Sequence, residues 1–252
     1  MPTLGRTEIE VSPLAIGCWA LAGGAMWGAQ DDKDAIAALH TALDNGINFF
    51  DTAEAYGSGY SEELVGKAFC ALPDRVVIGT KINLGNVEKV EEVETRCEDS
   101  LRRLRRDVID VYHIHWPGRR IDTEELVSAF QRLREKGKIR CFAVSNYGVN
   151  DLTDLLQHGR CEVNQLPYSL LWRPIEDEIM PLCRQHDISI TAYSPLMQGL
   201  LTGKYGSVED VPAGRRRTRI YSSSREEVAH GEPGCEEEVF SALDIVRDVA
   251  EE

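Results

Sequence analysis

The chain has 252 residues, of which 42% are hydrophobic, 7% aromatic and 28% charged, a composition typical of a folded globular protein. Its formal net charge of −14 argues against nucleic acid as a partner, because a protein this acidic repels phosphate backbones. No uncharged apolar run approaches the ~20 residues of a membrane span, so disordered, collagen-like and membrane-spanning classes are excluded.

Short apolar runs alternate with longer amphipathic stretches along the chain. A short hairpin is expected first, over residues 3–14. The predicted strands then cover residues 14–18, 47–51, 76–81, 109–115, 139–144, 162–165 and 188–193. Helices are predicted over residues 32–45, 61–71, 90–105, 123–136, 149–158 and 176–186, and a last one from Glu236 to the C-terminus. This alternation indicates an α/β protein with a parallel sheet.

Polar, chemically useful residues stand at the carboxyl ends of almost all of these strands. They are Asp51, Lys81, His115, Ser145, Asn146, Gln165, Tyr193 and Ser194. An open dinucleotide-binding sheet would carry G-x-G-x-x-G after its first strand, whereas only Ala22-Gly23-Gly24 follows here. Side chains that converge from many strand ends are typical of a (β/α)8 TIM barrel. We therefore expect one barrel domain over residues 1–252, with the hairpin closing its floor.

The number of predicted strands is one short of that barrel. Seven strands are predicted, and the chain after the seventh leads into the helical pattern that begins at Glu236. The expected fold is therefore a (β/α)8 barrel with an N-terminal hairpin, and its last strand–helix unit is missing from this chain.

The cysteines and the N-terminus indicate the cellular compartment. The seven cysteines are dispersed without a C-x-x-C pair, which argues against a disulfide framework and against a zinc knuckle. No secretory leader opens the sequence. We expect reduced cysteines in a cytoplasmic protein, whose oligomeric state the sequence leaves open.

Four residues near three consecutive strand ends suit acid–base chemistry on a carbonyl group. Tyr56 follows Asp51 by five residues, and Lys81 and His115 end the next two strands. A tyrosine titrates at about 10, and a neighbouring ammonium lowers this pKa towards the useful range. Lys81 is expected to supply that ammonium, with Asp51 as its counter-charge. His115 is expected to hydrogen-bond the reacting oxygen.

The pair His113 and His115 allows a second interpretation, a metal-dependent barrel hydrolase. Such a site needs further His or Asp ligands from other strand ends. The other histidines, at positions 40, 158, 186 and 230, fall in predicted helices or loops. No bound metal is therefore expected.

Seven segments together carry a family pattern: LGRTEIEVSPLAIG, GINFFDTAEAYGSGYSEELVGKAF, VIGTK, DVYHIHWP, AVSNYG, NQLPYSLL and AYSPLMQGLLTGKY. On these segments the chain resembles the aldo-keto reductase family from about residue 3 to about residue 205. The second segment, with its Asp-Thr-Ala-x-x-Tyr-Gly core, is highly specific. The resemblance supports the barrel fold and implies a function.

The function implied by the resemblance is hydride transfer between a nicotinamide dinucleotide and a small aldehyde or ketone, without metal or flavin. NADP is the expected cofactor, with NAD as the alternative. By the resemblance, Tyr56 is the general acid and Lys81 lowers its pKa. Asp51 pairs with the lysine, and His115 orients the carbonyl or helps to protonate it.

The resemblance also implies a cofactor site and a substrate pocket. Contacts to the nicotinamide are expected from Cys18, Trp19, Asp51, Ser145, Asn146 and Gln165, with Tyr193 stacked on its ring. Contacts to the pyrophosphate are expected from Ser194, Leu196, Gly199 and Lys204. Trp19, Trp27 and Trp116 are candidates for an apolar substrate pocket.

Two further expectations concern the adenosine half of the cofactor and the activity itself. In the family, a loop after an eighth strand grips the adenosine, and the arginines at positions 215, 216, 217 and 219 are candidates for a 2′-phosphate contact here. The family also includes ion-channel accessory subunits that hold the cofactor and turn over slowly. A cofactor-binding regulatory protein or an inactive relative is therefore the alternative to an enzyme.

Overall fold

The computed structural model describes residues 1–24, 26–225, 228 and 230–252. The chain forms two compact units, each of which is described by itself. The first unit comprises Met1–Gly24, Gly28–Leu166 and Pro174–Tyr193, and the second comprises Ala25–Trp27, Pro167–Arg173 and Ser194–Glu252. A single barrel domain over the whole chain therefore stays a prediction.

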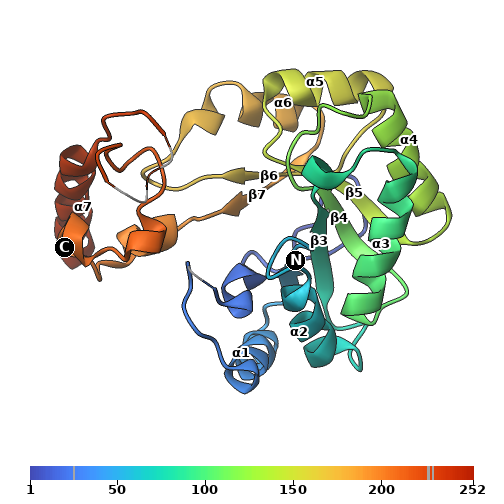
Figure 1. Cartoon of the computed structure of the whole chain (residues 1–252), viewed down its shortest axis with the longest axis horizontal. Helices are drawn as coiled ribbons and strands as arrows, with labels where there is room; N and C mark the ends of the chain where they lie inside the picture. The colour runs from blue at the N-terminus through green and yellow to red at the C-terminus, as the bar shows by residue number, and fades with distance from the viewer. Residues whose placement is uncertain (25, 226–227, 229) are drawn as a thin grey trace. The chain divides into compact units, whose positions relative to one another are not determined.

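The sheet contains seven strands in the order in which they occur along the chain (Figure 1). They are β1 (Ala15–Gly17), β2 (Phe49–Asp51), β3 (Val77–Ile82), β4 (Ile109–Ile114), β5 (Ile139–Ser145), β6 (Val163–Pro167) and β7 (Ser189–Tyr193). The pairs from β1 to β6 are all parallel. Sequential parallel strands linked by helices are the arrangement of a TIM-barrel-like fold, so the predicted fold class and strand number are confirmed.

The helices follow the strands as expected. They are α1 (Asp32–Asp44), α2 (Tyr60–Phe69), α3 (Glu91–Leu104), α4 (Thr123–Glu135), α5 (Val149–His158), α6 (Ile179–Gln185) and α7 (Glu236–Glu251). Asp31 caps α1, accepting hydrogen bonds from the backbone N–H groups of Lys33 and Asp34. The helix predicted over residues 176–186 begins only at Ile179, because the Pro181 ring is accommodated only in a first turn.

Alternation along the strands gives the sheet two separate cores. One face packs under the helices, and α3 and α4 lie beside it in Figure 1. The other face packs on the N-terminal hairpin, whose arms form an antiparallel bridge between Thr3 and Glu10. This inner cluster consists of Leu4, Ile9, Val11, Phe49, Val77, Val111, Cys141, Ala143 and Val163. The hairpin therefore fills the floor of the barrel, as predicted.

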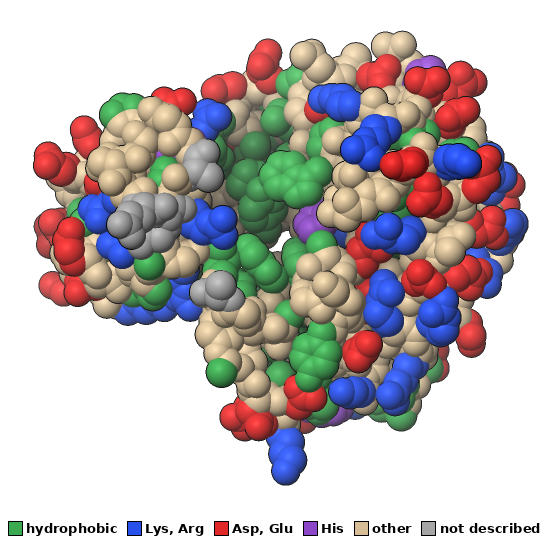
Figure 2. Space-filling view, viewed as in Figure 1, with side chains coloured by type: hydrophobic (Ala, Val, Ile, Leu, Met, Phe, Trp, Pro, Cys, Tyr) green, Lys and Arg blue, Asp and Glu red, His purple; other side chains and the backbone are tan. Residues whose placement is uncertain are grey.

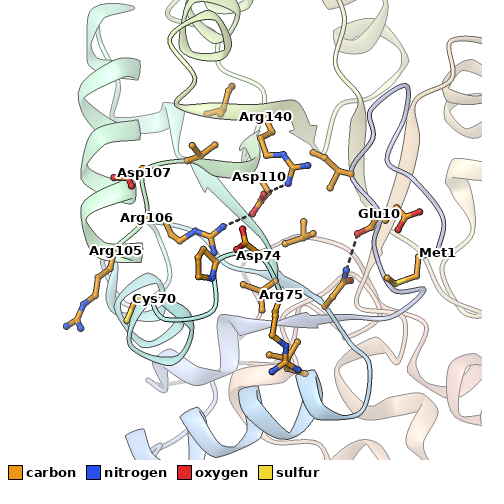
Figure 3. A pocket seen from close by; sticks show the side chains of 18 of the residues that line it. Met1, Glu10, Cys70, Asp74, Arg75, Arg105, Arg106, Asp107, Asp110 and Arg140 are labelled. Atoms are coloured by element: carbon orange, nitrogen blue, oxygen red, sulfur yellow. Dashed lines mark hydrogen bonds and ion pairs between the residues drawn. The ribbon is translucent and has the colours of Figure 1, made fainter.

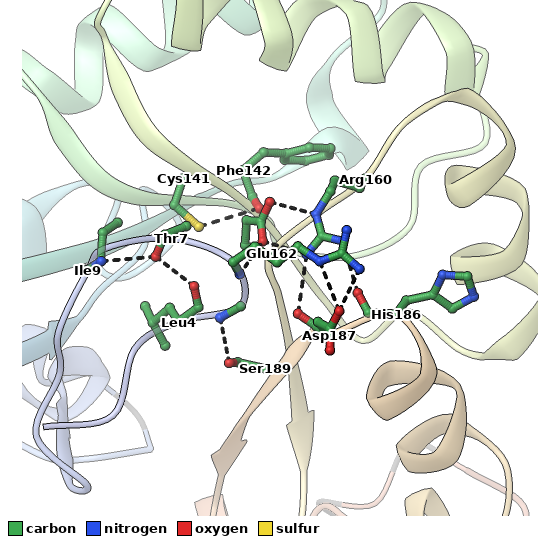
Figure 4. Close-up of polar contacts among 12 residues, drawn as sticks. Leu4, Thr7, Ile9, Cys141, Phe142, Arg160, Glu162, His186, Asp187 and Ser189 are labelled. Carbon is green, nitrogen blue, oxygen red and sulfur yellow. Dashed lines mark hydrogen bonds and ion pairs between the residues drawn. The ribbon is translucent and has the colours of Figure 1, made fainter.

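A buried carboxylate attaches the hairpin to the sheet (Figure 4). Glu162, 6% exposed, accepts hydrogen bonds from the Arg6 backbone N–H at 2.9 Å and from the Arg160 guanidinium at 2.8 and 2.7 Å. The neighbouring Gly5 N–H donates to Ser189 Oγ at 2.8 Å. Gly5 has a φ of 53°, and a Cβ there would lie 2.6 Å from the Glu162 carbonyl oxygen, so the close approach requires glycine.

The second unit is built mainly from loops and α7. Its core consists of Leu200, Tyr205, Val211, Ile220, Tyr221 and Leu243. Arg215 lies over the Trp27 ring at 4.9 Å from its centroid and donates to the Tyr205 hydroxyl at 3.0 Å. One member of the predicted arginine cluster is thus held inside this unit.

Charged side chains of both signs are intermixed over the helices of the first unit in Figure 2. Lys136 contacts Glu94, and Lys138 contacts Glu98 at 2.7 Å, so α3 is linked to the end of α4. The seven cysteines are free thiols, and five of them are buried. Within the described part of the chain, no helix has the length and apolar character needed to cross a bilayer.

Glu162→Gln is expected to destabilise the protein by about 1–3 kcal/mol at pH 7, because it removes the charge from a buried hydrogen-bonded group. Burial raises the pKa of Glu162, but the hydrogen bonds from Arg160 and from the Arg6 N–H outweigh burial and hold the pKa below its ordinary value. A lowered carboxyl pKa stabilises the fold above the unfolded pKa and ceases to do so as the pH falls through the folded pKa.

Urea unfolding of both proteins between pH 7 and pH 3 measures this effect. The difference in free energy of unfolding should shrink as the pH falls below about 4. The exposed Glu8, as Glu8→Gln, is the matched control and should leave the stability unchanged. A constant difference at all pH values would contradict the assignment.

Candidate active site

The carboxyl ends of the strands bring most of the predicted site residues to one edge of the sheet. Asp51 ends β2, Lys81 is the second-to-last residue of β3, and Ser145 ends β5. His115 follows β4 directly, and Gln165 lies within β6. Parallel strands end at the same edge, which is where barrel enzymes bind their substrates. We call Asp51, Tyr56, Lys81 and His115 the tetrad.

An ion pair between Lys81 and Asp51 lies at the centre of this edge. The Lys81 Nζ is 2.6 Å from Asp51 Oδ2 and donates to the Thr52 carbonyl at 2.7 Å. The Lys81 side chain is fully buried, and that of Asp51 is 14% exposed. Gln165 Nε2 donates to the second oxygen of Asp51 at 3.1 Å. The predicted pairing of Lys81 with Asp51 is therefore present in the geometry.

Tyr56 lies beside this pair in the loop between β2 and α2. Lys81 Nζ is 5.2 Å from the centroid of the Tyr56 ring. The His115 ring meets the Tyr56 ring edge-on at a centroid distance of 5.7 Å, and the Trp19 ring stacks on it at 5.8 Å. The structure thus gathers all four members of the tetrad, together with Trp19.

The pKa of Tyr56 corrects one expectation. Burial raises this pKa above the ordinary value for tyrosine, and the nearby Lys81 acts in the opposite direction without overcoming burial. Asp51 adds to the upward shift, because its negative charge disfavours a second one. In the protein alone, Tyr56 is therefore a protonated phenol rather than an acid with a lowered pKa.

His113, in β4, and His115, just after β4, are neutral. Burial and the Lys81 ammonium lower the pKa of His115 to about 4, and the same two causes lower that of His113 to about 4. His113 Nδ1 lies 3.2 Å from the Thr80 carbonyl, so that nitrogen carries the proton. Among the described residues, no group of three or more His, Cys, Asp or Glu side chains is arranged to hold a metal ion.

The loop that carries Tyr56 is fixed by residues that the sequence alone did not single out. Thr52 Oγ1 donates to Ser61 Oγ, which in turn donates to the Cys18 carbonyl, both at 2.8 Å. Glu54 accepts from the Asn83 backbone N–H at 2.6 Å and is bound by both arms of the Arg96 guanidinium at 2.9 and 2.6 Å. The one feature of the sequence that could have indicated this role of Glu54 is its position, two residues before Tyr56.

A second hydrogen-bonded group spans β5, β6 and β7. Asn146 donates to the His115 carbonyl and to Ser145 Oγ, each at 3.0 Å, and accepts from the Tyr193 hydroxyl at 2.9 Å. Ser145 Oγ also donates to the Gln165 carbonyl at 3.1 Å. The Tyr193 ring is therefore oriented by Asn146. Burial, together with the proximity of Tyr56, raises the pKa of Tyr193 to about 12.

The remaining predicted residues of the first unit differ in exposure. Cys18 is buried, and burial beside Asp51 holds its pKa well above the ordinary value, so it is a neutral thiol. Trp19 and Trp116 are 39% and 55% exposed. Large exposed aromatic rings next to Tyr56 and His115 are available for an apolar ligand.

The predicted pyrophosphate residues and Trp27 belong to the second unit and are not placed against the tetrad. Ser194 and Gly199 have φ angles of 52° and 108°, so the loop after β7 turns through left-handed conformations. A Cβ on Gly199 would lie 2.7 Å from Lys204 Cε, and the Lys204 ammonium is 4.8 Å from the Tyr205 ring centroid. Leu196 is exposed.

Comparison with known proteins shows which proteins this chain is similar to. The profile of the family described as "Aldo/keto reductase family" matches residues 13–252. The aldo-keto reductase YhdN of Bacillus subtilis is 38% identical over 215 residues, which cover 80% of this chain and 63% of YhdN. The NADH-specific methylglyoxal reductase of Escherichia coli is 35% identical over 86% of this chain and 73% of its own length. The probable voltage-gated potassium channel subunit beta of Arabidopsis thaliana is 34% identical, covering 80% and 65%.

Solved structures show the same similarity. The glycerol dehydrogenase of Gluconobacter oxydans superposes with a TM-score of 0.82 at 32% identity, over 99% of this chain and 77% of its own. An aldo/keto reductase of Klebsiella pneumoniae, in complex with NADP and acetate, superposes with a TM-score of 0.68 at 30% identity, covering 93% and 86%. In the sequence comparison, the chain spans 63% of the length of YhdN, which is somewhat less than two thirds.

Lys81→Met is expected to destabilise the protein by about 3–5 kcal/mol, because it leaves the Asp51 carboxylate largely buried without its counter-charge. Adding Asp51→Asn to Lys81→Met removes that charge and should recover part of the loss. The midpoints of urea unfolding measure both effects. Equal midpoints for the single and the double variant would show that the ion pair does not carry the stability assigned to it.

Proposed function

This chain belongs to the aldo/keto reductase family, and we propose that it transfers a hydride between a nicotinamide dinucleotide and the carbonyl carbon of a small aldehyde or ketone. The observation that carries the proposal is the buried Lys81–Asp51 pair beside Tyr56, with the neutral His115 at the edge of the same ring. This arrangement supplies one proton and one neutral hydrogen-bond donor to a carbonyl oxygen.

The chemistry of the donor set at the neighbouring strand ends fits a nicotinamide. Ser145, Asn146 and Gln165 supply one hydroxyl and two amides, which match the hydrogen-bonding groups of a carboxamide. Tyr193 supplies a half-buried aromatic ring whose hydroxyl is held by Asn146. When bound, a nicotinamide would supply or accept the hydride, and the Tyr193 ring would be available to stack on it. The Klebsiella pneumoniae relative is in complex with NADP.

Tyr56 serves as the proton donor in the direction of reduction. The phenol is protonated at neutral pH, because its pKa lies above the ordinary value for tyrosine of about 10, which is itself well above 7. The proton is therefore available when negative charge develops on the carbonyl oxygen. The O–H bond of Tyr56 breaks as the alkoxide is protonated, and the Lys81 ammonium stabilises the phenolate that remains. Lys81 therefore acts on the product of the proton transfer.

His115 and Asp51 hold this machinery in place. The imidazole of His115, with a pKa of about 4, is neutral and donates a hydrogen bond to the carbonyl oxygen without losing a proton. Asp51 fixes the position of Lys81 through their ion pair, and Gln165 in turn holds Asp51 by a hydrogen bond. Trp19 and Trp116 provide apolar surface for the rest of the substrate.

Tyr56→Phe is expected to lower kcat for aldehyde reduction by about 10²–10⁴, because it removes the proton donor. The affinity for NADPH, measured by quenching of tryptophan fluorescence, should change little. Tyr60→Phe is the matched control, since Tyr60 is exposed and bonds Asp32 of α1, and it should leave kcat unchanged. Full activity of Tyr56→Phe on a panel of small aldehydes would refute the assignment.

The similarity to a channel subunit supports a second candidate function, a cofactor-binding regulatory protein. Both functions need the nicotinamide site, so cofactor binding does not separate them. The test is the loss of NADPH absorbance with excess aldehyde. Oxidation of many NADPH molecules per molecule of protein supports the enzyme. Binding of NADPH without sustained turnover supports the regulatory protein.

The choice between NADP and NAD is proposed to involve the exposed arginines of the second unit. Arg217 and Arg219 are exposed, whereas Arg215 and Arg216 are half-buried. Replacing Arg217 and Arg219 by serine should weaken NADPH binding by up to about tenfold and NADH binding much less, because only NADPH carries a 2′-phosphate. Arg132→Ser, an exposed arginine of α4, is the control. Equal weakening of both cofactors would exclude a 2′-phosphate contact.

A further inference from the structure

A cavity opens at the end of the strands opposite to the tetrad (Figure 3). Its volume is about 1020 Å³, and it lies entirely within the first unit. It is lined by residues just before β3 and β4, by the first residues of β5 and by the N-terminal hairpin. Barrel enzymes carry out their chemistry at the other end of the strands, so this cavity is separate from the site described above.

One buried carboxylate and two guanidinium groups meet in this cavity. Asp110 of β4, with 4% of its side chain exposed, is 2.7 Å from Arg140 Nη1 and 3.5 Å from Arg106 Nη2. The Ile78 backbone N–H also donates to Asp110, at 2.9 Å. Figure 3 shows both arginines turned towards Asp110. The cluster therefore carries two positive charges and one negative charge.

Arg106 is the member of this cluster with unused hydrogen-bonding capacity. Its side chain is only 10% exposed, and within the described residues its Nη1 is buried without a hydrogen-bond partner. A buried guanidinium nitrogen without an acceptor is costly, and such groups in native proteins are normally satisfied by a ligand, an ion or water. A planar guanidinium matches carboxylate and phosphate oxygens in particular.

The surroundings of Arg106 limit the kind of ligand. The other carboxylates of the cavity wall, those of Glu10, Asp74 and Asp107, are exposed, and none of the described ion pairs joins them to Arg106. The remaining arginines, Arg75 and Arg105, are exposed as well. In Figure 3 the Arg105 side chain is directed away from Arg106. Arg106 is thus the one largely buried arginine among the described residues that line the cavity, and the Arg140 side chain beside it is 47% exposed.

The cavity also offers apolar surface next to these charges. Val76, Val77 and Ile139 are buried and line the cavity. A ligand that fits has an anionic head and a small apolar body. We propose that this cavity is a second binding site, which takes a small organic anion whose carboxylate or phosphate is bound by the guanidinium groups of Arg106 and Arg140.

Titration of the full-length chain with phenyl phosphate, and separately with benzoate, tests the site. Backbone amide shifts in NMR spectra report the location, with Ile78 and Gly137 beside the cavity and Asn146 at the other end of the strands. The expected result is saturable shifts at Ile78 and Gly137. Tighter binding of phenyl phosphate identifies a phosphate ligand, and tighter binding of benzoate identifies a carboxylate ligand.

Two neighbouring arginines provide a matched pair of variants. Arg106→Gln and Arg105→Gln remove the same charge from adjacent positions, and only the first is expected to weaken binding, by at least about tenfold. Arg106→Lys keeps the charge beside Asp110 but loses the planar fork, and it should also bind more weakly. Arg106→Lys keeps a positive charge next to Asp110, so it can be tested even if Arg106→Gln fails to fold.

Asp74→Asn provides a test in the opposite direction. It removes a negative charge that lines the same cavity and should tighten binding. Equal effects of Arg106→Gln and Arg105→Gln, or shifts confined to the Asn146 end, would overturn the proposal. Absence of saturable shifts with both probes at millimolar concentration would overturn it as well.

Discussion

The candidate site depends on one buried ion pair, and the register of the sheet determines where that pair forms. Asp51 pairs with Gly79, which places Lys81 one inward-facing position further along β3. Gly79 has no side chain, and a Cβ there would lie 3.3 Å from Asp51 Oδ1 and 3.5 Å from His113. The missing side chain leaves room for the Asp51 carboxylate. Tyr56, Gln165 and the Thr52 carbonyl are then arranged around the Lys81–Asp51 pair.

A buried pair of this kind is stable only where every remaining hydrogen-bonding group is satisfied. The same solution recurs on the outer face of the sheet. Glu62 is fully buried, and it accepts from Thr80 Oγ1 and from the Arg103 guanidinium, each at 2.6 Å. Thr80 and Lys81 are adjacent in β3 and point to opposite faces, so this strand carries a buried polar contact on each side. These contacts link β3 to α2 and α3 on one face and to the end of β2 on the other.

The features that the sequence predicts well are local or periodic. Strand and helix spacing predicts the parallel sheet, and polar residues at strand ends predict that Asp51, Lys81 and His115 meet. Long-range contacts outside the strand-end pattern are not accessible in this way. Nothing in the local pattern of Glu162 connects it to Arg6, which lies 156 residues away. The pKa of Tyr56 is a similar case, because it depends on how strongly burial outweighs Lys81, and burial is a property of the folded chain.

The tetrad by itself does not determine the substrate or the rate. Relatives at comparable identity include a methylglyoxal reductase and a probable channel subunit, so similar chains are associated with different roles. In a barrel, specificity comes from the loops beyond the strand ends, where Trp19 and Trp116 are exposed in this chain. In the proposed function, these four residues determine the kind of chemistry, which is the transfer of one proton to a carbonyl oxygen. Resemblance in the tetrad alone therefore does not identify a substrate for this chain.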